Sequence, residues 1–473
     1  MSSVSQILSK ISQEGRIVLE MSLLPTEKTS FQIGHKKIVG EKAIFDLTHH
    51  MLLFEKIYVN NEEILIEQMQ HDSEVNLNDG VKKLKVMWSE STLHKPLRSE
   101  VFDLVKQLSN SWNVGLFDSM KYFKTLRQYQ QKEIQSLDIK DYPLVRKSEL
   151  REAYHYLNIV LCSYGWMGLN YFGHGSGATD FLRAKSDQKA LQEHLDIPKE
   201  HILKYSFSVK VFKPGFFVIY HEERNEIVFN IRGTLTLQDC VTDLVCNYLP
   251  YKGGYVHEGM YKAAVRIYEK LKDDVEEWSS RYNTRKLVFV GHSMGGSVGG
   301  LLSRIFMDQF DGLIVKSFSF GGPPTVTENI LPLFNHCISC VNQNDWAPRA
   351  SYGALMHLKE SMSTIHKNKN KTNPKIFEEL NKPSQVDFPD MLIPGRVFWM
   401  HKNTDKMTSE RIYRTKKLKK PKPHYIMQEI NAKELIQIQI DPKMLYYHFP
   451  NMYEKSFMKS YQYLNESKLL QQK

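Results

Sequence analysis

The residues with the clearest chemical potential surround Ser293, in the stretch Gly291-His292-Ser293-Met294-Gly295. An apolar run at 287–290 predicts a buried strand before it, and the small residues after it predict the start of a helix. G-x-S-x-G between a strand and a helix is typical of a nucleophile elbow, where the two glycines let both elements pass closely. The backbone N–H of Met294 then lies at the positive end of the new helix, where an oxyanion is favoured.

A serine nucleophile needs a histidine that accepts its proton and a carboxylate that orients this histidine. In folds with this elbow the chain order is serine, acid, histidine, so the candidates follow residue 293. Asp345 comes directly after the predicted strand 337–341, whereas Asp311 fits a turn that ends a helix. His448 lies between the last predicted strand and a terminal helix and is the first candidate for the base, and His401, at the end of another strand, is the second.

Beyond residue 207 the pattern predicts strands that alternate with helices. We expect a hairpin of 216–220 and 227–231, a long helix over 259–278, and strands leading into the elbow and at 314–320, 337–341, 396–400 and 435–440. A further helix is predicted over 148–164. This alternation indicates an α/β fold with helices on both faces of a sheet.

The N-terminal part has a different pattern. Apolar and polar residues alternate at 16–23 and 84–88, so residues 14–92 are expected to form a β-rich module, with a C2-like sandwich as its most specific version. The paired aspartates of a calcium site are not evident. Residues 93–147 are expected to form a helical connector to a larger domain.

Composition limits the function classes. The 473 residues are 41% hydrophobic and 25% charged, which is typical of a folded chain of two or three domains. No stretch has the roughly 20 apolar residues that cross a bilayer, and the N-terminus lacks a secretory pattern, so a cytoplasmic location is expected. The five scattered cysteines are expected to be reduced, and Cys337 and Cys340 to be buried strand residues and not metal ligands.

The net charge of +10 admits an anionic partner. One basic run contains Lys367, Lys369 and Lys371, and a second comprises Arg411, Arg414, Lys416, Lys417, Lys419, Lys420 and Lys422. Neither has the interleaved aromatic residues of a nucleic-acid platform, so nucleic acid is not expected as a partner. An anionic membrane surface and a merely solvated basic loop remain the two alternatives.

Residues 148–465 resemble the class 3 lipases, and within them the diacylglycerol lipase-like branch. The resemblance rests on an ordered set of motifs: Ile231-Arg232-Gly233-Thr234 with Asp239 and Asp243, Val256-His257-Glu258-Gly259-Met260, Gly291-His292-Ser293-Met294-Gly295-Gly296, Phe320-Gly321-Gly322-Pro323, Asn344-Asp345-Trp346-Ala347-Pro348-Arg349, and His448-Phe449-Pro450 with Tyr453. It implies an α/β-hydrolase fold, with a mostly parallel sheet flanked by helices.

The resemblance also implies residue roles: Ser293 as nucleophile, Asp345 as orienting carboxylate and His448 as base. The backbone N–H groups of Thr234 and Met294 would form the oxyanion hole. Between Thr234 and His257 the family places a lid, and the apolar side of that stretch comprises Leu235, Leu237, Val241, Leu244 and Val245. An ordinary packed surface helix is the alternative for this stretch.

Two departures from the family pattern are evident. Met294 stands where leucine is usual, which a backbone donor tolerates. An insertion at about 351–390 and a basic loop at about 402–424 separate Asp345 from His448. The four-helix membrane region of the animal diacylglycerol lipases has no counterpart here, so the protein is expected to reach a membrane or lipid droplet from the water side.

The expected activity is hydrolysis of acylglycerols, with diacylglycerol or triacylglycerol favoured, through an acyl-enzyme and without a cofactor or metal. One alternative is phospholipase or thioesterase chemistry on the same triad. The other is a catalytically silent lipid-binding scaffold.

Overall fold

The structure is a computed structural model, and it describes residues 17–24, 29–33, 36–40, 42–47, 57–60, 62–64, 73–76, 83–90, 116–136, 142–172, 174, 186–206, 214–233, 248–382, 390–402 and 425–471. These residues belong to two compact units, Met1–Pro96 and Leu97–Lys473, and each is described by itself.

The first unit is built from antiparallel strands. One sheet has the order β4-β1-β8-β7 and the other β3-β2-β5-β6. The bounds are β1 Ile17–Leu24, β2 Thr29–Ile33, β3 Lys36–Gly40, β4 Lys42–Leu47, β5 Ile57–Val59, β6 Glu62–Ile64, β7 Ser73–Asn76 and β8 Lys83–Glu90. Met21, Phe31, Val59 and Leu84 are fully buried. The C2-like assignment of this module stays a prediction.

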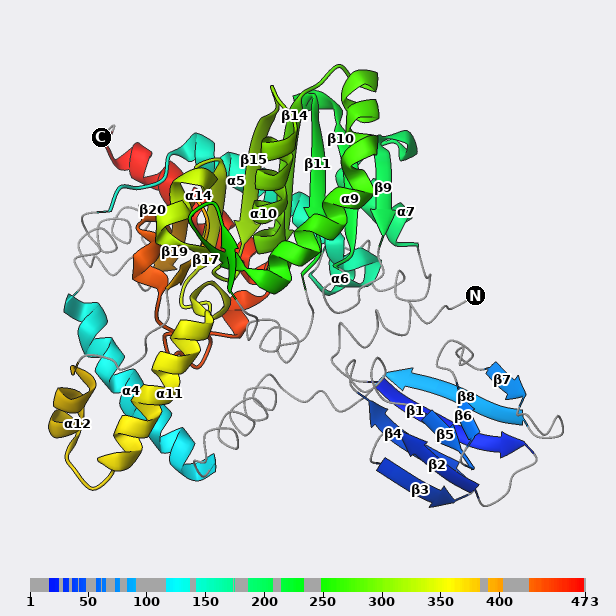
Figure 1. The fold of residues 1–473 in the computed structure, drawn as a ribbon, viewed down its shortest axis with the longest axis horizontal. Coiled ribbons are helices and arrows are strands. Elements are labelled where there is room, and N and C mark those ends of the chain that lie inside the picture. Colours follow the sequence, from blue (N-terminus) through cyan, green and yellow to red (C-terminus); the bar gives the residue numbers. More distant parts are fainter. Residues whose placement is uncertain are drawn as a thin grey trace. The chain divides into compact units, whose positions relative to one another are not determined.

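The second unit is organised around an eight-stranded sheet of order β20-β19-β17-β15-β14-β11-β10-β9 (Figure 1). Its strands are β9 Ile202–Ser206, β10 Phe216–His221, β11 Glu226–Ile231, β14 Lys286–His292, β15 Ile314–Phe320, β17 Cys337–Asn342, β19 Arg396–Lys402 and β20 Tyr425–Ile430. The five central strands, from β11 to β19, pair in parallel, and the outer pairs are antiparallel. The mostly parallel α/β-hydrolase sheet is therefore confirmed.

Helices cover both faces of this sheet, because its central strands are apolar on both sides. In β14, Leu287 and Phe289 pack with α9 (Glu258–Arg281) and α10 (Met294–Gln309). Val288 and Val290 face the opposite cluster with α5 (Lys147–Leu161) and α14 (Pro450–Gln471). Figure 1 shows α9 and α10 in front of the strands.

Shorter elements complete this unit. They are α6 Gly165–Tyr171, α7 Asp187–Leu195, the strands β12 Tyr248–Tyr251, β13 Gly254–His257, β16 Val326–Thr327 and β18 Met391–Leu392, and the 3-10 turns η3 Cys162–Tyr164, η5 Lys199–His201, η6 Glu222–Arg224, η7 Glu328–Phe334, η8 Ala347–Arg349, η9 Ala432–Leu435 and η10 Tyr446–His448. Strands β12, β13, β16 and β18 form a small separate sheet.

Most predicted elements of the second unit are confirmed, including the hairpin β10–β11 and the strand β15. The strand predicted at 435–440 is wrong, because the chain there begins with the turn η9 and continues without strand pairing. Ile438 is buried and Ile440 packs at the edge of the core, so the apolar alternation of this segment reflects packing. The last strand is β20, at 425–430.

Three helices form a projection that the sequence did not predict as a unit. Helix α4 (Leu116–Ser136) lies in the predicted connector, and it packs against α11 (Tyr352–Lys367), which is followed by α12 (Asn373–Leu380). Hydrogen bonds from Tyr122 to His366 (2.9 Å) and from Tyr129 to Asn381 (2.8 Å) join these elements. We call this three-helix group the helical arm.

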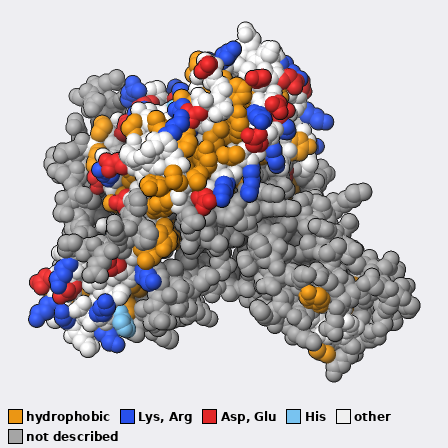
Figure 2. All heavy atoms as spheres, in the orientation of Figure 1, with side chains coloured by type: hydrophobic (Ala, Val, Ile, Leu, Met, Phe, Trp, Pro, Cys, Tyr) orange, Lys and Arg blue, Asp and Glu red, His pale blue; other side chains and the backbone are white. Residues whose placement is uncertain are grey.

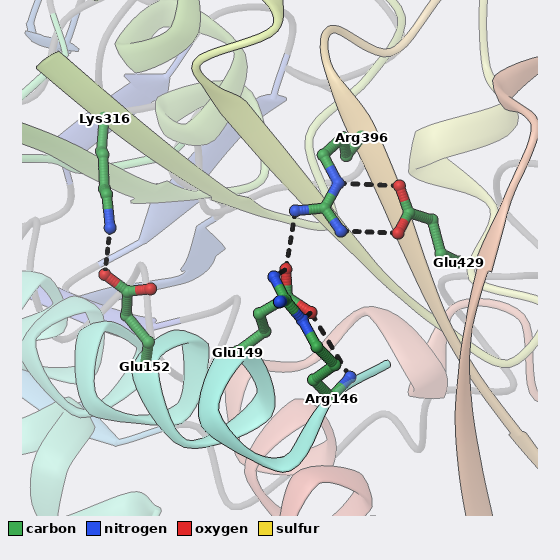
Figure 3. A network of polar contacts seen from close by, with 6 residues as sticks. All are labelled: Arg146, Glu149, Glu152, Lys316, Arg396 and Glu429. Carbon is green, nitrogen blue, oxygen red and sulfur yellow. Dashed lines mark hydrogen bonds and ion pairs between the residues drawn. The ribbon is translucent and has the colours of Figure 1, made fainter. Parts of the chain in front are cut away.

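An ion-pair network joins one helix to the edge of the large sheet (Figure 3). Arg396 on β19 binds Glu429 on β20 in a bidentate pair, with N–O distances of 2.7 and 2.6 Å, and donates to Glu149 on α5 at 2.7 Å. Arg146 donates to the same Glu149 at 3.0 Å. Glu152, one helical turn later, pairs instead with Lys316.

Replacement of Glu149 tests how much this network stabilises the second unit. The hydrogen bonds from Arg146, together with Arg396, hold the pKa of Glu149 at about 2, below its ordinary value of 4.5. A depressed carboxyl pKa stabilises the fold above the ordinary value, and this stabilisation is lost as pH falls towards the folded-state value. We expect Glu149→Gln to lower the free energy of unfolding by about 1.5–3 kcal/mol at pH 7.

Urea unfolding at neutral and acidic pH checks this expectation. The difference between wild type and Glu149→Gln should shrink from pH 4.5 towards pH 2, over the range set by the two pKa values. Glu152→Gln is the control on the same helix, and its more exposed pair should contribute less than about 1 kcal/mol. Equal losses for the two variants, or a pH-independent difference, would contradict the account.

Candidate active site

The turn after β14 has the geometry of a nucleophile elbow. Ser293 has φ 57° and ψ −139°, a backbone conformation that L residues rarely adopt, and α10 begins at the next residue. The N–H of Ser293 donates to the carbonyl of Phe320 on the adjacent strand at 2.9 Å, which fixes the turn to the sheet. Such strain persists only where the surrounding structure enforces it.

The glycines of the motif are required by close backbone contacts. A Cβ atom on Gly291 would lie 2.4 Å from the carbonyl carbon of Gly295, and one on Gly295 would lie 2.1 Å from the carbonyl oxygen of Ile231. The prediction that these two residues supply room is therefore confirmed. The elbow is wedged against the end of β11 as well as against its own helix.

Ser293, His448 and Asp345 meet in one hydrogen-bonded chain, as the sequence predicted. The Oγ of Ser293 lies 2.9 Å from Nε2 of His448. Nδ1 of the same ring lies 3.0 Å from both carboxylate oxygens of Asp345. Since a carboxylate only accepts, Nδ1 carries the proton and Nε2 is free to accept the serine proton.

The Asp345 carboxylate is completely buried and has two further donors. The hydroxyl of Tyr453 donates to Oδ2 at 2.6 Å, and the N–H of Ala347 donates to Oδ1 at 3.0 Å. Burial and the neighbouring Asp345 raise the pKa of Tyr453 well above its ordinary value, so the phenol stays a neutral donor. Gly321, with φ 68°, lies against this group, because a Cβ there would be 2.9 Å from Oδ2 of Asp345.

His292 supports the segment that carries His448. Its Nε2 lies 2.6 Å from the backbone carbonyl oxygen of His448, and its Nδ1 lies 2.6 Å from the hydroxyl of Tyr164. Because the carbonyl only accepts, Nε2 carries the proton and Nδ1 accepts from Tyr164. Burial, together with His448, holds the pKa of His292 well below its ordinary value, so this ring remains neutral.

A second contact holds the same segment from the sheet side. The amide nitrogen of Asn342, at the end of β17, donates to the carbonyl of Tyr447 at 2.9 Å, and the hydroxyl of Ser456 donates to the amide oxygen of Asn342 at 2.8 Å. The position of the imidazole is therefore set by the carboxyl ends of β14 and β17.

One expected oxyanion donor is described. Met294 is the first residue of α10, so its backbone N–H has no acceptor inside the helix. Thr234 and the proposed lid residues Leu235, Leu237, Val241, Leu244 and Val245 lie outside the described residues. Gly233, directly before Thr234, passes so close to the elbow that a Cβ on it would lie 2.9 Å from the Cβ of Ser293.

The remaining candidates lie elsewhere. His401 is stacked on Trp399 and bonded to Gln428 at 2.6 Å, away from Ser293, and Asp311 lies in the turn after α10. Cys337 and Cys340 are buried free cysteines, as predicted. Among the residues that the structure describes, no group of three or more His, Cys, Asp or Glu side chains could hold a metal ion.

Sequence reasoning missed the supporting roles of Tyr164, His292 and Gly321. His292 and Gly321 were visible inside quoted motifs, but their contacts depend on which segments meet in space. Tyr164 had no sequence signal, because it lies in the turn η3, 128 residues before His292.

The chain also resembles known proteins. Residues 228–354 match the family described as Lipase (class 3). Mouse diacylglycerol lipase-beta is 26% identical over 257 residues, which cover 49% of this chain and 38% of that protein. Human diacylglycerol lipase-alpha is 30% identical over 129 residues, or 24% of this chain and 12% of that protein. A lipase of Rhizopus microsporus var. chinensis has a TM-score of 0.39 at 14% identity, covering 62% of this chain and 85% of that one.

The matched regions therefore cover well under half of the length of these two mammalian relatives. The matched family segment contains both Ser293 and Asp345. On these matches, residues 228–354 are similar to the class 3 lipases, and the chain is similar over longer or shorter stretches to proteins named diacylglycerol lipase.

Proposed function

We propose that this protein is a serine esterase that hydrolyses acylglycerols, with diacylglycerol or triacylglycerol as the favoured substrate. The observation that carries the proposal is the continuous hydrogen-bonded chain from Ser293 Oγ through His448 to the buried carboxylate of Asp345. The substrate class rests on the similarity to proteins named diacylglycerol lipase.

The reaction follows from this geometry. His448 Nε2 takes the Ser293 proton while Oγ attacks the ester carbonyl carbon, and the N–H of Met294 stabilises the resulting oxyanion. The carbon–oxygen bond to the glycerol moiety then breaks, and the same Nε2 gives its proton to the leaving alcohol. In the second half, His448 Nε2 takes a proton from water as the water oxygen attacks the acyl carbon. The bond between the acyl carbon and Ser293 Oγ then breaks, Nε2 returns the proton to Oγ, and the fatty acid is released. No cofactor enters either half.

A lipid substrate also requires contact with a lipid surface. Among the helices that the structure describes, none has both the length and the apolar character to span a bilayer. We propose a peripheral association with a membrane or droplet, in which the stretch after Thr234 acts as a lid and basic segments contact anionic lipid. This part of the proposal rests on the apolar residues of that stretch and on the net charge of +10.

Ser293→Ala tests the proposed chemistry. Loss of the nucleophile should lower kcat by about 10⁶ towards the residual rate that binding and the oxyanion hole provide. The measurement is fatty-acid release from a panel of diacylglycerol, triacylglycerol, phospholipid and acyl-thioester substrates. A preference for phospholipid or thioester would replace the acylglycerol assignment. Full activity of Ser293→Ala, or no activity of folded wild type, would refute the proposal that the protein is a serine esterase that uses Ser293.

Tyr453→Phe tests the support of the buried carboxylate. The variant removes one hydrogen bond to a charged group, worth about 1.5–3 kcal/mol, so kcat should fall about tenfold or more while KM changes little. Tyr461→Phe is the control, because this tyrosine lies on the same helix and accepts a hydrogen bond from Arg151 at the surface. A loss of activity in the control that matched the loss in Tyr453→Phe would show that the effect is not specific.

His292→Leu tests the positioning of the base. Loss of the bond to the His448 carbonyl should lower kcat about tenfold, as expected for one hydrogen bond, with KM retained. His292→Gln keeps a donor and an acceptor of similar reach and should recover part of the loss. If both variants lost activity only in proportion to their thermal stability, His292 would have a structural role alone.

A further inference from the structure

The helical arm carries an excess of positive charge. Helix α4 and residues 352–382 together contain ten Lys and Arg residues and five Asp and Glu residues. The excess of five positive charges is half of the net charge of +10. Lys367, Lys369, Lys371, Lys375 and Lys382 are exposed at its far end. Figure 2 shows blue side chains gathered at the lower left, where Figure 1 places α11 and α12.

These lysines are only partly neutralised. Glu379 pairs with Lys382 at 2.6 Å and with Lys371 at 3.4 Å. In the described part of the chain, no carboxylate lies within ion-pair distance of Lys367, Lys369 or Lys375. The end of the arm therefore presents at least three lysines that are available to an external anion.

The loop that carries the lysines is held in one shape. The side chain of Asn368 donates to the carbonyl of Thr364 at 2.8 Å, and the N–H of Lys371 donates to the carbonyl of Asn368 at 2.8 Å. Asn373 donates to Gln128 on α4 at 3.0 Å, which ties the start of α12 to the neighbouring helix. A preformed array of charges loses less conformational entropy on binding than a flexible one.

The root of the arm lies at the edge of the sheet that carries the active site. Helix α11 begins at Tyr352, three residues after the turn η8 that follows Asp345, so it leaves from the carboxyl end of β17. The other end of α4 is anchored nearby, because Gln130 bonds to the backbone of Ile438 and Ile440 at 2.8 and 2.9 Å. Strand β11 ends at the same edge, at Ile231.

We infer that the end of the helical arm is an electrostatic docking surface for anionic lipid bilayers. The inference rests on the proposed function, because a lipid substrate is what favours a bilayer over an acidic protein as the partner. Each lysine near a negatively charged leaflet adds attraction that falls off within a Debye length, so several lysines act together and salt weakens them. Docking there would hold the same edge of the sheet that bears Ser293 near the lipid.

Vesicle flotation with the full chain tests this inference. The arm variant is Lys367→Glu/Lys369→Glu/Lys375→Glu. The matched control is Lys199→Glu/Arg285→Glu/Lys286→Glu, which reverses three exposed charges at the opposite edge, where β9 and β14 begin. Wild type and control should bind phosphatidylcholine vesicles that contain phosphatidylserine and be released by salt, and the arm variant should bind about tenfold or more weakly.

Equal binding of the arm variant and wild type would overturn the inference, as would equal binding of wild type to vesicles without phosphatidylserine. Hydrolysis of a short water-soluble ester separates this outcome from failure of the proposed function. The arm variant should retain that activity, and Ser293→Ala should lose it while still binding anionic vesicles. Loss of soluble-ester hydrolysis by the arm variant would mean that the Glu substitutions disturb the fold. The variant Lys367→Gln/Lys369→Gln/Lys375→Gln would then replace it, and undiminished vesicle binding by this variant would refute docking.

Discussion

The constraint on which the rest of this structure depends is the close packing of the turn at Ser293 between its own helix and the end of β11. Gly291 and Gly295 allow backbone contacts that any Cβ would prevent, and Ser293, at a positive φ, has its hydroxyl within hydrogen-bond distance of His448. The same packing fixes the start of α10, and with it the N–H of Met294. One local arrangement thus determines the position of both the Ser293 hydroxyl and the Met294 N–H.

The parallel sheet extends this constraint to the other members of the site. Because the carboxyl ends of parallel strands lie at one edge, the loop after β17 brings Asp345 close to the elbow. His448 comes from much later in the chain. Its carbonyl accepts a hydrogen bond from His292, and the carbonyl of the preceding Tyr447 accepts one from the side chain of Asn342. The position of the His448 imidazole is therefore held from two strand ends, and its Nδ1 is hydrogen-bonded to the buried carboxylate of Asp345.

The sequence predicted the parts of this account that local patterns encode. The elbow, the alternating strands and helices, and the order of Ser293, Asp345 and His448 follow from spacing, apolar periodicity and resemblance to a family. The 435–440 strand was wrong because an alternating apolar pattern cannot distinguish strand pairing from a chain segment that packs irregularly on the core. The packing of α4 on α11 and the bond between Tyr164 and His292 join distant segments, so no local pattern could specify them.

The central claim is that His448, oriented by Asp345, removes the proton from Ser293, and reaction with a fluorophosphonate measures this most directly. We predict a single adduct on the peptide containing Ser293 in wild type, and labelling of His448→Ala slower by about 10³-fold or more, as expected for loss of a base that acts with the nucleophile. Circular dichroism should show that the variant is folded. An adduct on another residue, or equal labelling rates for wild type and His448→Ala, would contradict the account.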